Sequence, residues 1–277
     1  MSLSSNKIAR RILLHVVFIL LSVIFIFPFL WMFMGAFKDD VEVIKMPPTL
    51  LPSKFNFDNF RTISTLFPVG RFLLNSVIVA FTSTSLQLIF CAMAAYVFAK
   101  MKFRGREILF TLFLITMMVP KQLTMITLYR IFVNLHLQNS YLGLILPSTY
   151  NALGIFLMRQ HIRTIPDSFA EAATVDGASH FKIFFKIVLP LCKPALATVG
   201  ILGFMESWNS FLWPLIITSS TELATLPLGL SKLQGRWTTA WNLLMAGNVI
   251  STIPILIVYL FAQKYFIKSL AQSGIKG

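Results

Sequence analysis

Six long apolar runs, separated by short segments that carry most of the charge, dominate this sequence. They cover about residues 12–37, 72–99, 108–126, 141–158, 195–217 and 241–262. Each run is long enough to cross a hydrocarbon core of about 30 Å as a helix. Because the runs do not alternate apolar with polar residues, they do not form a membrane β-barrel, and helices satisfy the backbone inside lipid. The sequence therefore predicts an all-α integral membrane protein with six transmembrane helices.

The distribution of Lys and Arg predicts how these helices are oriented. Only 12% of the 277 residues are charged, about half of the roughly 25% that is usual in soluble domains. A cytoplasmic N-terminus puts most of the 24 basic residues on cytoplasmic segments, with 100–106 as the densest cluster. Six spans then leave both termini in the cytoplasm. This bias explains the net charge of +14, and because no basic face persists over any length, no nucleic-acid partner is expected.

The expected organisation is a single transmembrane domain over residues 1–277, embedded in a lipid membrane. Residues 38–71 and 218–240 are expected to form extracellular loops, and residues 159–194 an unusually long cytoplasmic segment. Inverted repeats of the kind found in many secondary transporters are not visible in the sequence.

Motifs for catalysis, metal binding and nucleotide binding are missing from the sequence. Cys91 and Cys192 lie on different segments and four His residues are scattered, so neither a disulfide nor a metal site is expected. A GxxxxGK[ST] loop for ATP phosphates is also missing. A membrane-embedded glycosyltransferase would need paired acidic motifs, and Asp39, Asp40 and Glu42 form one cluster without a second. We therefore expect no enzyme activity and no cofactor on this chain.

The cytoplasmic segment contains a pattern for two short helices around a glycine. Helix formers fill residues 168–175, and Gly177 suits the left-handed conformation that ends a helix. Ser179 can cap a second helix that carries a cluster of phenylalanines. An amphipathic pair of this kind suits either a groove on a partner protein or the lipid interface, and the physical pattern leaves both open.

The same segment resembles a known motif. It reads EAATVDGAS over residues 171–179, followed by IVLP over residues 187–190. This is similar to the EAA loop of ABC importer permeases, in which E-A-A, a glycine and I-x-L-P follow in this order and spacing. The resemblance implies a type I ABC importer permease fold and a loop that docks into a cleft of a cytoplasmic ATPase subunit. The residues implied in that contact are Glu171, Ala172, Ala173, Asp176, Gly177, Ala178, Phe181, Leu189 and Pro190.

The resemblance also implies a role for individual residues of this loop. Glu171 pairs with a basic residue of the ATPase, and the two alanines that follow it permit a close approach. Gly177 makes the turn between the helices, and Ala178 and Phe181 fill the cleft.

Two further stretches resemble the smaller six-helix subunit of maltose-type sugar permeases. ESWNSFLWPLI over residues 206–216 is similar to its W-N-x-F-x-x-P-L signature, and QSGIKG over residues 272–277 is similar to its G-x-V-K-G ending, with Ile275 in place of the usual Val. The resemblance implies a bacterial cell membrane protein and tail residues that contact the ATPase, namely Gly274, Lys276 and Gly277.

The same resemblance implies a set of partners. They are a second permease subunit in a heterodimer, two copies of a cytoplasmic ATPase that bind ATP and Mg, and an extracellular sugar-binding protein that faces the loop at 218–240. The implied substrate is a sugar, with oligosaccharides as the common cargo of the family.

Glu206 is the only acidic residue inside a predicted span, and it lies near the middle of that span. Asn209, Ser210 and Trp213 follow it at i+3, i+4 and i+7, and together with Gly203 they are expected on one helical face. Carboxylate, amide and indole groups suit the hydroxyls and the apolar ring face of a sugar. Protonation or pairing of Glu206 inside the helix bundle explains the same pattern, so a substrate pathway and internal packing both stay open.

Two other transport mechanisms account for some of these features. A proton-coupled secondary transporter would use Glu206 as its relay, but it leaves the EAA-like loop unexplained. An ABC permease for a non-sugar solute, such as a glycerol phosphate ester, would keep the loop. The interpretation that covers most features is a translocation subunit of an ATP-driven, binding-protein-dependent sugar importer that works by alternating access.

Overall fold

The computed structural model describes residues 5–234 and 239–274, and its regular elements in these ranges are helices. Apart from them, the described part has one isolated bridge between Gln234 and Thr239. The predicted all-α class is therefore confirmed. The chain divides into two compact units, the first made of the residues up to Val69 with Leu230–Ile253, and the second made of Gly70–Gly229 with the residues from Pro254 onward.

Asn59 organises the first unit. The helices of this unit are α1 (Ser5–Gly35), α2 (Asp40–Val43), α3 (Asp58–Leu66) and the first part of α15 (Trp241–Gly274). The buried Asn59 amide donates hydrogen bonds to the carbonyls of Ala36 at 2.9 Å and Lys38 at 2.8 Å. Its oxygen accepts a hydrogen bond of 3.0 Å from Asn242. One side chain thus links the segment after α1, α3 and the start of α15.

Helix α1 exposes apolar side chains around its circumference. Ile24 is 65% exposed and Phe25 is 71% exposed, and their neighbours along the helix are similar. A helix that is apolar all round lies either inside a large protein core or in lipid. Its composition and exposure therefore give α1 the character of a membrane span.

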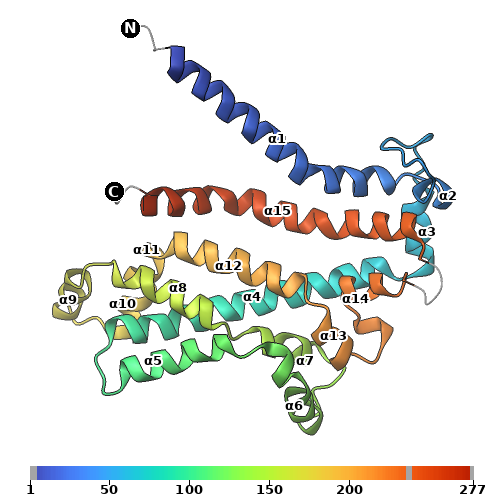
Figure 1. Cartoon of the computed structure of the whole chain (residues 1–277). Coiled ribbons are helices and arrows are strands. Elements are labelled where there is room, and N and C mark those ends of the chain that lie inside the picture. The colour runs from blue at the N-terminus through green and yellow to red at the C-terminus, as the bar shows by residue number, and fades with distance from the viewer. Residues whose placement is uncertain (1–4, 235–238, 275–277) are drawn as a thin grey trace. The chain divides into compact units, whose positions relative to one another are not determined.

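The second unit holds the remaining helices, of which α8 packs against α5 and α12, and α13 packs against α6 and α7 (Figure 1). The bounds are α4 (Val69–Lys100), α5 (Arg106–Ile115), α6 (Lys121–Asn134), α7 (Tyr141–Ile145), α8 (Ala152–Arg163), α9 (Ser168–Val175), α10 (His180–Ile183), α11 (Leu189–Leu191), α12 (Lys193–Trp208), α13 (Leu212–Ile217) and most of α14 (Leu226–Ser231), with the second part of α15. The largest buried side chains of its main core cluster include Met158, Ile162 and Ile183.

Up to six membrane spans are present in the described residues. Three single helices are long and apolar enough to cross a membrane, and these are Arg10–Gly35, Val69–Lys100 and Trp241–Phe261. Three bent pairs meet the same criteria when each pair is taken together, and these are Arg106–Met118 with Lys121–Asn134 at 101°, Tyr141–Ser148 with Ala152–Arg163 at 46°, and His180–Leu191 with Lys193–Trp208 at 80°. The total reaches six if every bent pair is one span. Which side of the membrane the termini face stays a prediction.

The apolar runs at 108–126, 141–158 and 195–217 are interrupted in the structure, and each break has a local cause. Val119 is extended because it precedes Pro120, which starts the next helix. The Asn151 side chain caps α8 by accepting a hydrogen bond of 2.8 Å from the Gly154 amide. Asn209 ends α12, and its side chain donates to the Met205 carbonyl at 2.9 Å. We call the three breaks at 119–120, 149–151 and 209–211 the helix breaks.

Candidate functional site

The EAA-like loop (residues 166–190) folds into the two short helices that its sequence predicts. Helix α9 ends before Gly177, whose φ of +75° is the left-handed conformation expected there. Ser179 caps α10 by accepting a hydrogen bond of 3.4 Å from the Lys182 amide. After α10 the chain makes a π-helical turn over Phe184–Val188 and then α11. The turn at Gly177 therefore sets the angle between α9 and α10.

Polar side chains of α4 hold this loop at the C-terminal end of α4. Lys100 Nζ donates to the Ile165 carbonyl at 2.5 Å and forms an ion pair of 2.6 Å with Asp167 Oδ1. The hydrogen bond from Lys100 and the charge of its ammonium group hold the pKa of Asp167 below its usual range. The Tyr96 hydroxyl lies 3.3 Å from His180 Nδ1. The start of α9 and the start of α10 are thus both linked to the same helix.

We expect Lys100→Met to loosen α9 without unfolding the unit. The substitution removes both bonds that Lys100 makes to residues 165 and 167. Hydrogen bonds to charged groups stabilise local structure. Their loss should therefore accelerate amide exchange in α9 by about tenfold. Hydrogen-exchange mass spectrometry measures this, with Lys102→Met as the matched control because Lys102 is exposed and close in sequence. Equal exchange in the two variants would show that Lys100 does not hold the loop.

One side of the EAA-like loop contacts the core of the second unit. Ala173, Ala178 and Leu189 are half-buried and pack against the cluster that contains Ile183. Phe184 is buried with them, whereas Phe181 and Phe185 are exposed, and the three rings form the expected cluster through contacts of Phe185 with the other two. The close packing of Ala173 and Ala178 explains why small side chains are needed here, and any contact of these two alanines with a partner stays a prediction.

The other side of the loop is exposed and carries one carboxylate among apolar side chains. Glu171, Ala172, Asp176, Gly177 and Pro190 are exposed, and Phe181 is 66% exposed. Within residues 5–234 and 239–274, the Glu171 carboxylate has no hydrogen-bond or ion-pair partner. This surface offers a single anionic group for a partner of opposite charge.

The sequence pattern did not single out Val175, although it is 89% exposed at the end of α9. It follows Glu171 at i+4, so the two side chains lie on one face of α9. The i+4 spacing from Glu171 could have identified Val175 from the sequence. Phe169 is also exposed and was also missed.

A buried arginine fastens α8 to α4 and α5 close to the loop. Arg159 is 3% exposed, and its Nη2 contacts Glu107 Oε1 at 2.6 Å and Oε2 at 2.8 Å. Its Nε donates to the Phe98 carbonyl at 3.0 Å, and its guanidinium lies 3.9 Å from the centre of the Phe110 ring. One nitrogen contacts both carboxylate oxygens while Nε bonds a backbone carbonyl, and several donors on one planar group favour Arg over Lys here. In the sequence, Arg159 contributed only to the predicted orientation of the helices. Its interaction with Glu107 was not predicted.

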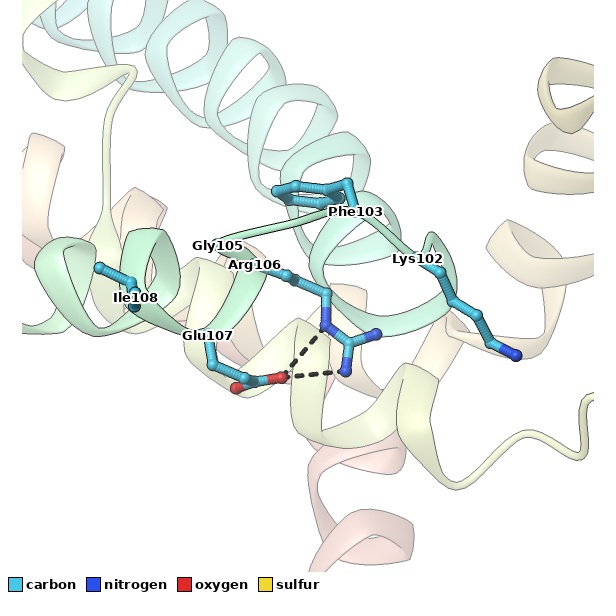
Figure 2. A pocket seen from close by; sticks show the side chains of 6 residues that line it. All are labelled: Lys102, Phe103, Gly105, Arg106, Glu107 and Ile108. Atoms are coloured by element: carbon cyan, nitrogen blue, oxygen red, sulfur yellow. Dashed lines mark hydrogen bonds and ion pairs between the residues drawn. The ribbon is translucent and has the colours of Figure 1, made fainter.

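The turn between α4 and α5 forms a hollow of about 540 Å³ beside this clasp (Figure 2). Figure 2 shows Arg106 and Glu107 pointing toward each other, with the carboxylate bridged to the guanidinium. Gly105 has a φ of +83°, which allows the sharp turn before α5. Because Glu107 contacts both Arg106 and Arg159, it joins the turn to the buried end of α8.

The four predicted pathway residues meet in one cavity of about 670 Å³. Glu206, Asn209, Ser210 and Trp213 all line it, together with residues of α6 and of the segment before α8. The expectation that they share one face of a continuous helix is wrong, because α12 ends at Trp208 and α13 begins at Leu212. All three helix breaks contribute lining residues, so the cavity forms where the bent segments meet.

Trp213 serves as a fixed wall of this cavity. Its side chain is 8% exposed, and its indole Nε1 donates a hydrogen bond of 2.9 Å to the Gly143 carbonyl. The ring packs edge-on against Phe132, with the centroids 5.5 Å apart. The indole N–H is therefore already bonded to the protein, which leaves the exposed Asn209 and the half-buried Ser210 as polar groups of the cavity.

Glu206 is paired, and its partners come from two other segments. Its Oε1 forms an ion pair with Lys121 Nζ, and its Oε2 accepts a hydrogen bond of 3.1 Å from Asn151 Nδ2. Lys121 directly follows the first helix break, and Asn151 belongs to the second. Lys121 was a missed site residue, yet it is the only Lys or Arg inside the six apolar runs, as Glu206 is the only acidic residue there. Ionisable groups in membranes usually pair with one another, and that was the usable signal.

The chain is similar in sequence to transport proteins over nearly its whole length. The family model described as "Binding-protein-dependent transport system inner membrane component" matches residues 87–272. The arabinooligosaccharides transport system permease protein AraQ of Bacillus subtilis (strain 168) is 38% identical over 273 residues, covering 96% of each chain. The sn-glycerol-3-phosphate transport system permease protein UgpE of Yersinia pestis bv. Antiqua (strain Antiqua) is 33% identical over 276 residues, covering 97% of this chain and 98% of the relative.

Solved structures show the same similarity in three dimensions. A chain of a bacterial ABC transporter involved in the import of the acidic polysaccharide alginate superposes with a TM-score of 0.83 at 26% identity, covering 96% of this chain and 99% of that chain. A second chain, from a bacterial alginate ABC transporter in complex with an alginate pentasaccharide-bound periplasmic protein, has a TM-score of 0.63 at 16% identity and is similar in fold alone.

Proposed function

The chain belongs to the family of binding-protein-dependent transport system inner membrane components, and on that premise we propose that it forms one wall of the pathway in an ATP-driven oligosaccharide importer. The observation that supports the proposal is Glu171, which is exposed and has no partner among the described residues, on a loop that Lys100 links to the long apolar helix α4. The substrate class is supported by the 38% identity to an arabinooligosaccharide permease.

The proposed coupling runs from the EAA-like loop to α4. The partner contact is made by Glu171, Ala172, Asp176, Gly177 and Phe181, which are exposed. A basic residue of the ATPase pairs with Glu171, and Val175 on the same helical face adds apolar contact. A displacement of α9 then reaches α4 through Lys100 and reaches the unit core through Ala173, Ala178 and Leu189. Closure of the ATPase dimer around ATP thereby changes the packing of the spans.

The remaining partners follow from the family. We propose a second permease as the other half of the pathway, and two copies of a cytoplasmic ATPase that hold ATP and Mg, so that hydrolysis takes place outside this chain. An external sugar-binding protein delivers the cargo to the loop at 218–240. The proposed ATPase-contacting tail begins at Gly274, which ends α15. Lys276 and Gly277 lie outside the described residues. Both termini are proposed to face the cytoplasm of a bacterial cell.

A glycerol phosphate ester is the second candidate cargo, because UgpE is 33% identical over nearly the whole chain. The cavity beside Glu206 favours the oligosaccharide. Its volume of about 670 Å³ exceeds the needs of a three-carbon ester, and Lys121, the one cation among its described lining residues, is already paired with Glu206. A phosphate group would require an unpaired cation or a cluster of donors. Membership of the family also argues against a proton relay at Glu206.

We expect Glu171→Lys to abolish binding of the ATPase subunit. The reversed charge would repel the basic residue that the wild-type carboxylate attracts. The measurement is co-purification of a soluble ATPase with the chain from detergent-solubilised membranes. Glu222→Lys is the matched control, because it makes the same charge change at an exposed position on the loop proposed to face outward. Failure of any ATPase to co-purify with the wild type would contradict the proposed function.

A further inference from the structure

Two cavities of the second unit meet at the Lys121–Glu206 ion pair. One has a volume of about 670 Å³ and the other about 340 Å³. Both are lined by Thr116, Val119, Lys121, Tyr150 and Glu206. A hydrogen bond of 2.7 Å between the Thr116 and Tyr150 hydroxyls lies among the same shared residues. The ion pair thus stands at the boundary that any molecule crossing from one cavity to the other must pass.

The charge of this boundary is balanced. Among the described residues that line the two cavities, Lys121 and Glu206 are the only charged ones. The remaining polar lining is made of neutral hydroxyl and amide groups, such as those of Ser148, Asn209 and Ser210. The side chains of the pair are 74% and 49% exposed, so both are accessible to a passing molecule. The wall therefore offers strong hydrogen-bonding groups but no net charge.

We propose that the Lys121–Glu206 pair is a specificity element that favours uncharged over acidic saccharides in the pathway. The proposal rests on the function proposed above and names its substrate class more closely. Charged groups form stronger hydrogen bonds to hydroxyls than neutral groups do, so the pair serves a neutral sugar well. A carboxylate on the sugar instead meets Glu206, while Lys121 is already neutralised.

The fold by itself does not decide this preference. A transporter chain that superposes with a TM-score of 0.83 belongs to an importer of an acidic polysaccharide. Cargo charge must therefore be selected by side chains placed on a shared scaffold. Lys121 and Glu206 are the described charged side chains in the position to do so.

The test compares two single substitutions that change the wall charge in opposite directions. Glu206→Gln leaves Lys121 unpaired, and Lys121→Gln leaves Glu206 unpaired. Equilibrium dialysis of labelled arabinotriose and trigalacturonate is performed on the complete transporter in nanodiscs, without the binding protein. Glu206→Gln is expected to shift the ratio of the two dissociation constants toward trigalacturonate by about tenfold, and Lys121→Gln in the opposite direction. The double variant, which lacks both charged groups, should lose the wild-type preference, with a ratio that lies between those of the two single variants.

Opposite shifts in the single variants and a lost preference in the double variant distinguish selectivity from a structural role, which would weaken binding of both ligands alike. Shifts of the same sign, an unchanged ratio, or no saturable binding of either sugar to the wild type would overturn the inference. Uptake of arabinotriose by the wild type, with its binding protein present, reports on the proposed function separately. Uptake with an unchanged charge preference in the variants would refute the specificity element and leave the importer function standing.

Discussion

Replacing Gly177 by proline is expected to stop sugar uptake while the protein stays in the membrane and ATP hydrolysis continues. Gly177 has a φ of +75°, whereas proline is fixed near −65°. Proline also removes the amide that donates to the Thr174 carbonyl at 3.0 Å. Forced into this turn, the backbone is strained by roughly 1–3 kcal/mol, and α9 must tilt against α10. The exposed Glu171 then no longer faces its partner, so uptake should fall by about tenfold or more.

The experiment measures uptake of labelled oligosaccharide, ATP hydrolysis and the amount of protein in the membrane for the same variants. Gly177→Asn is the control, since asparagine tolerates the left-handed region better than other residues with a Cβ. It should retain most of the uptake. Normal uptake by Gly177→Pro would mean that the angle between α9 and α10 does not transmit the motion.

Gly143→Ala is expected to destabilise the second unit strongly, because no side chain fits at this position. A Cβ there would lie 2.2 Å from the Leu137 backbone oxygen and 3.3 Å from Ile217 Cγ1. The flexible end of a side chain could move away from such a clash, but a backbone oxygen cannot do so without moving the chain. Relief of the clash also shifts the Gly143 carbonyl, which accepts the bond from Trp213. Overpacking of this kind costs about 1–3 kcal/mol.

The apparent melting temperature of the detergent-solubilised protein measures this effect, and it should fall by several degrees. Gly70→Ala provides the matched control, because a Cβ at Gly70 has no atom within 4 Å. It lies in helical structure, where alanine is favoured over glycine. Equal melting temperatures for the two variants would contradict the tight turn between α6 and α7.

The sequence predicts some features of this structure better than others, depending on how many residues determine each feature. The apolar runs located the helices because membrane insertion depends on summed hydrophobicity over many residues. They did not reveal the helix breaks, which depend on single residues such as Pro120 and Asn151. Gly177 and Ser179 were correctly interpreted as a turn and a cap, since these conformations are determined within a few residues.

The candidate sites show the same limit. Glu206 was identified because a lone acidic residue in an apolar run is conspicuous, whereas its partners Lys121 and Asn151 lie 85 and 55 residues away. Arg159 and Glu107 are separated by 52 residues, and the sequence assigned them no common role. Contacts of this kind depend on which helices pack together. A single sequence, considered without an alignment of relatives, does not show which helices these are.

The helix breaks have a consequence for how proteins of this family can diverge. At the helix breaks, the cavity is lined by Val119, Tyr150, Asn209, Ser210 and Phe211, while α8 packs against α5 and α12. Substitutions of these lining side chains are expected to change the cavity without altering the contacts of α8 with α5 and α12. Relatives that keep a third or more of the sequence are named for arabinooligosaccharides and for glycerol-3-phosphate. We therefore expect a change of cargo in this family to involve the side chains at these three short segments.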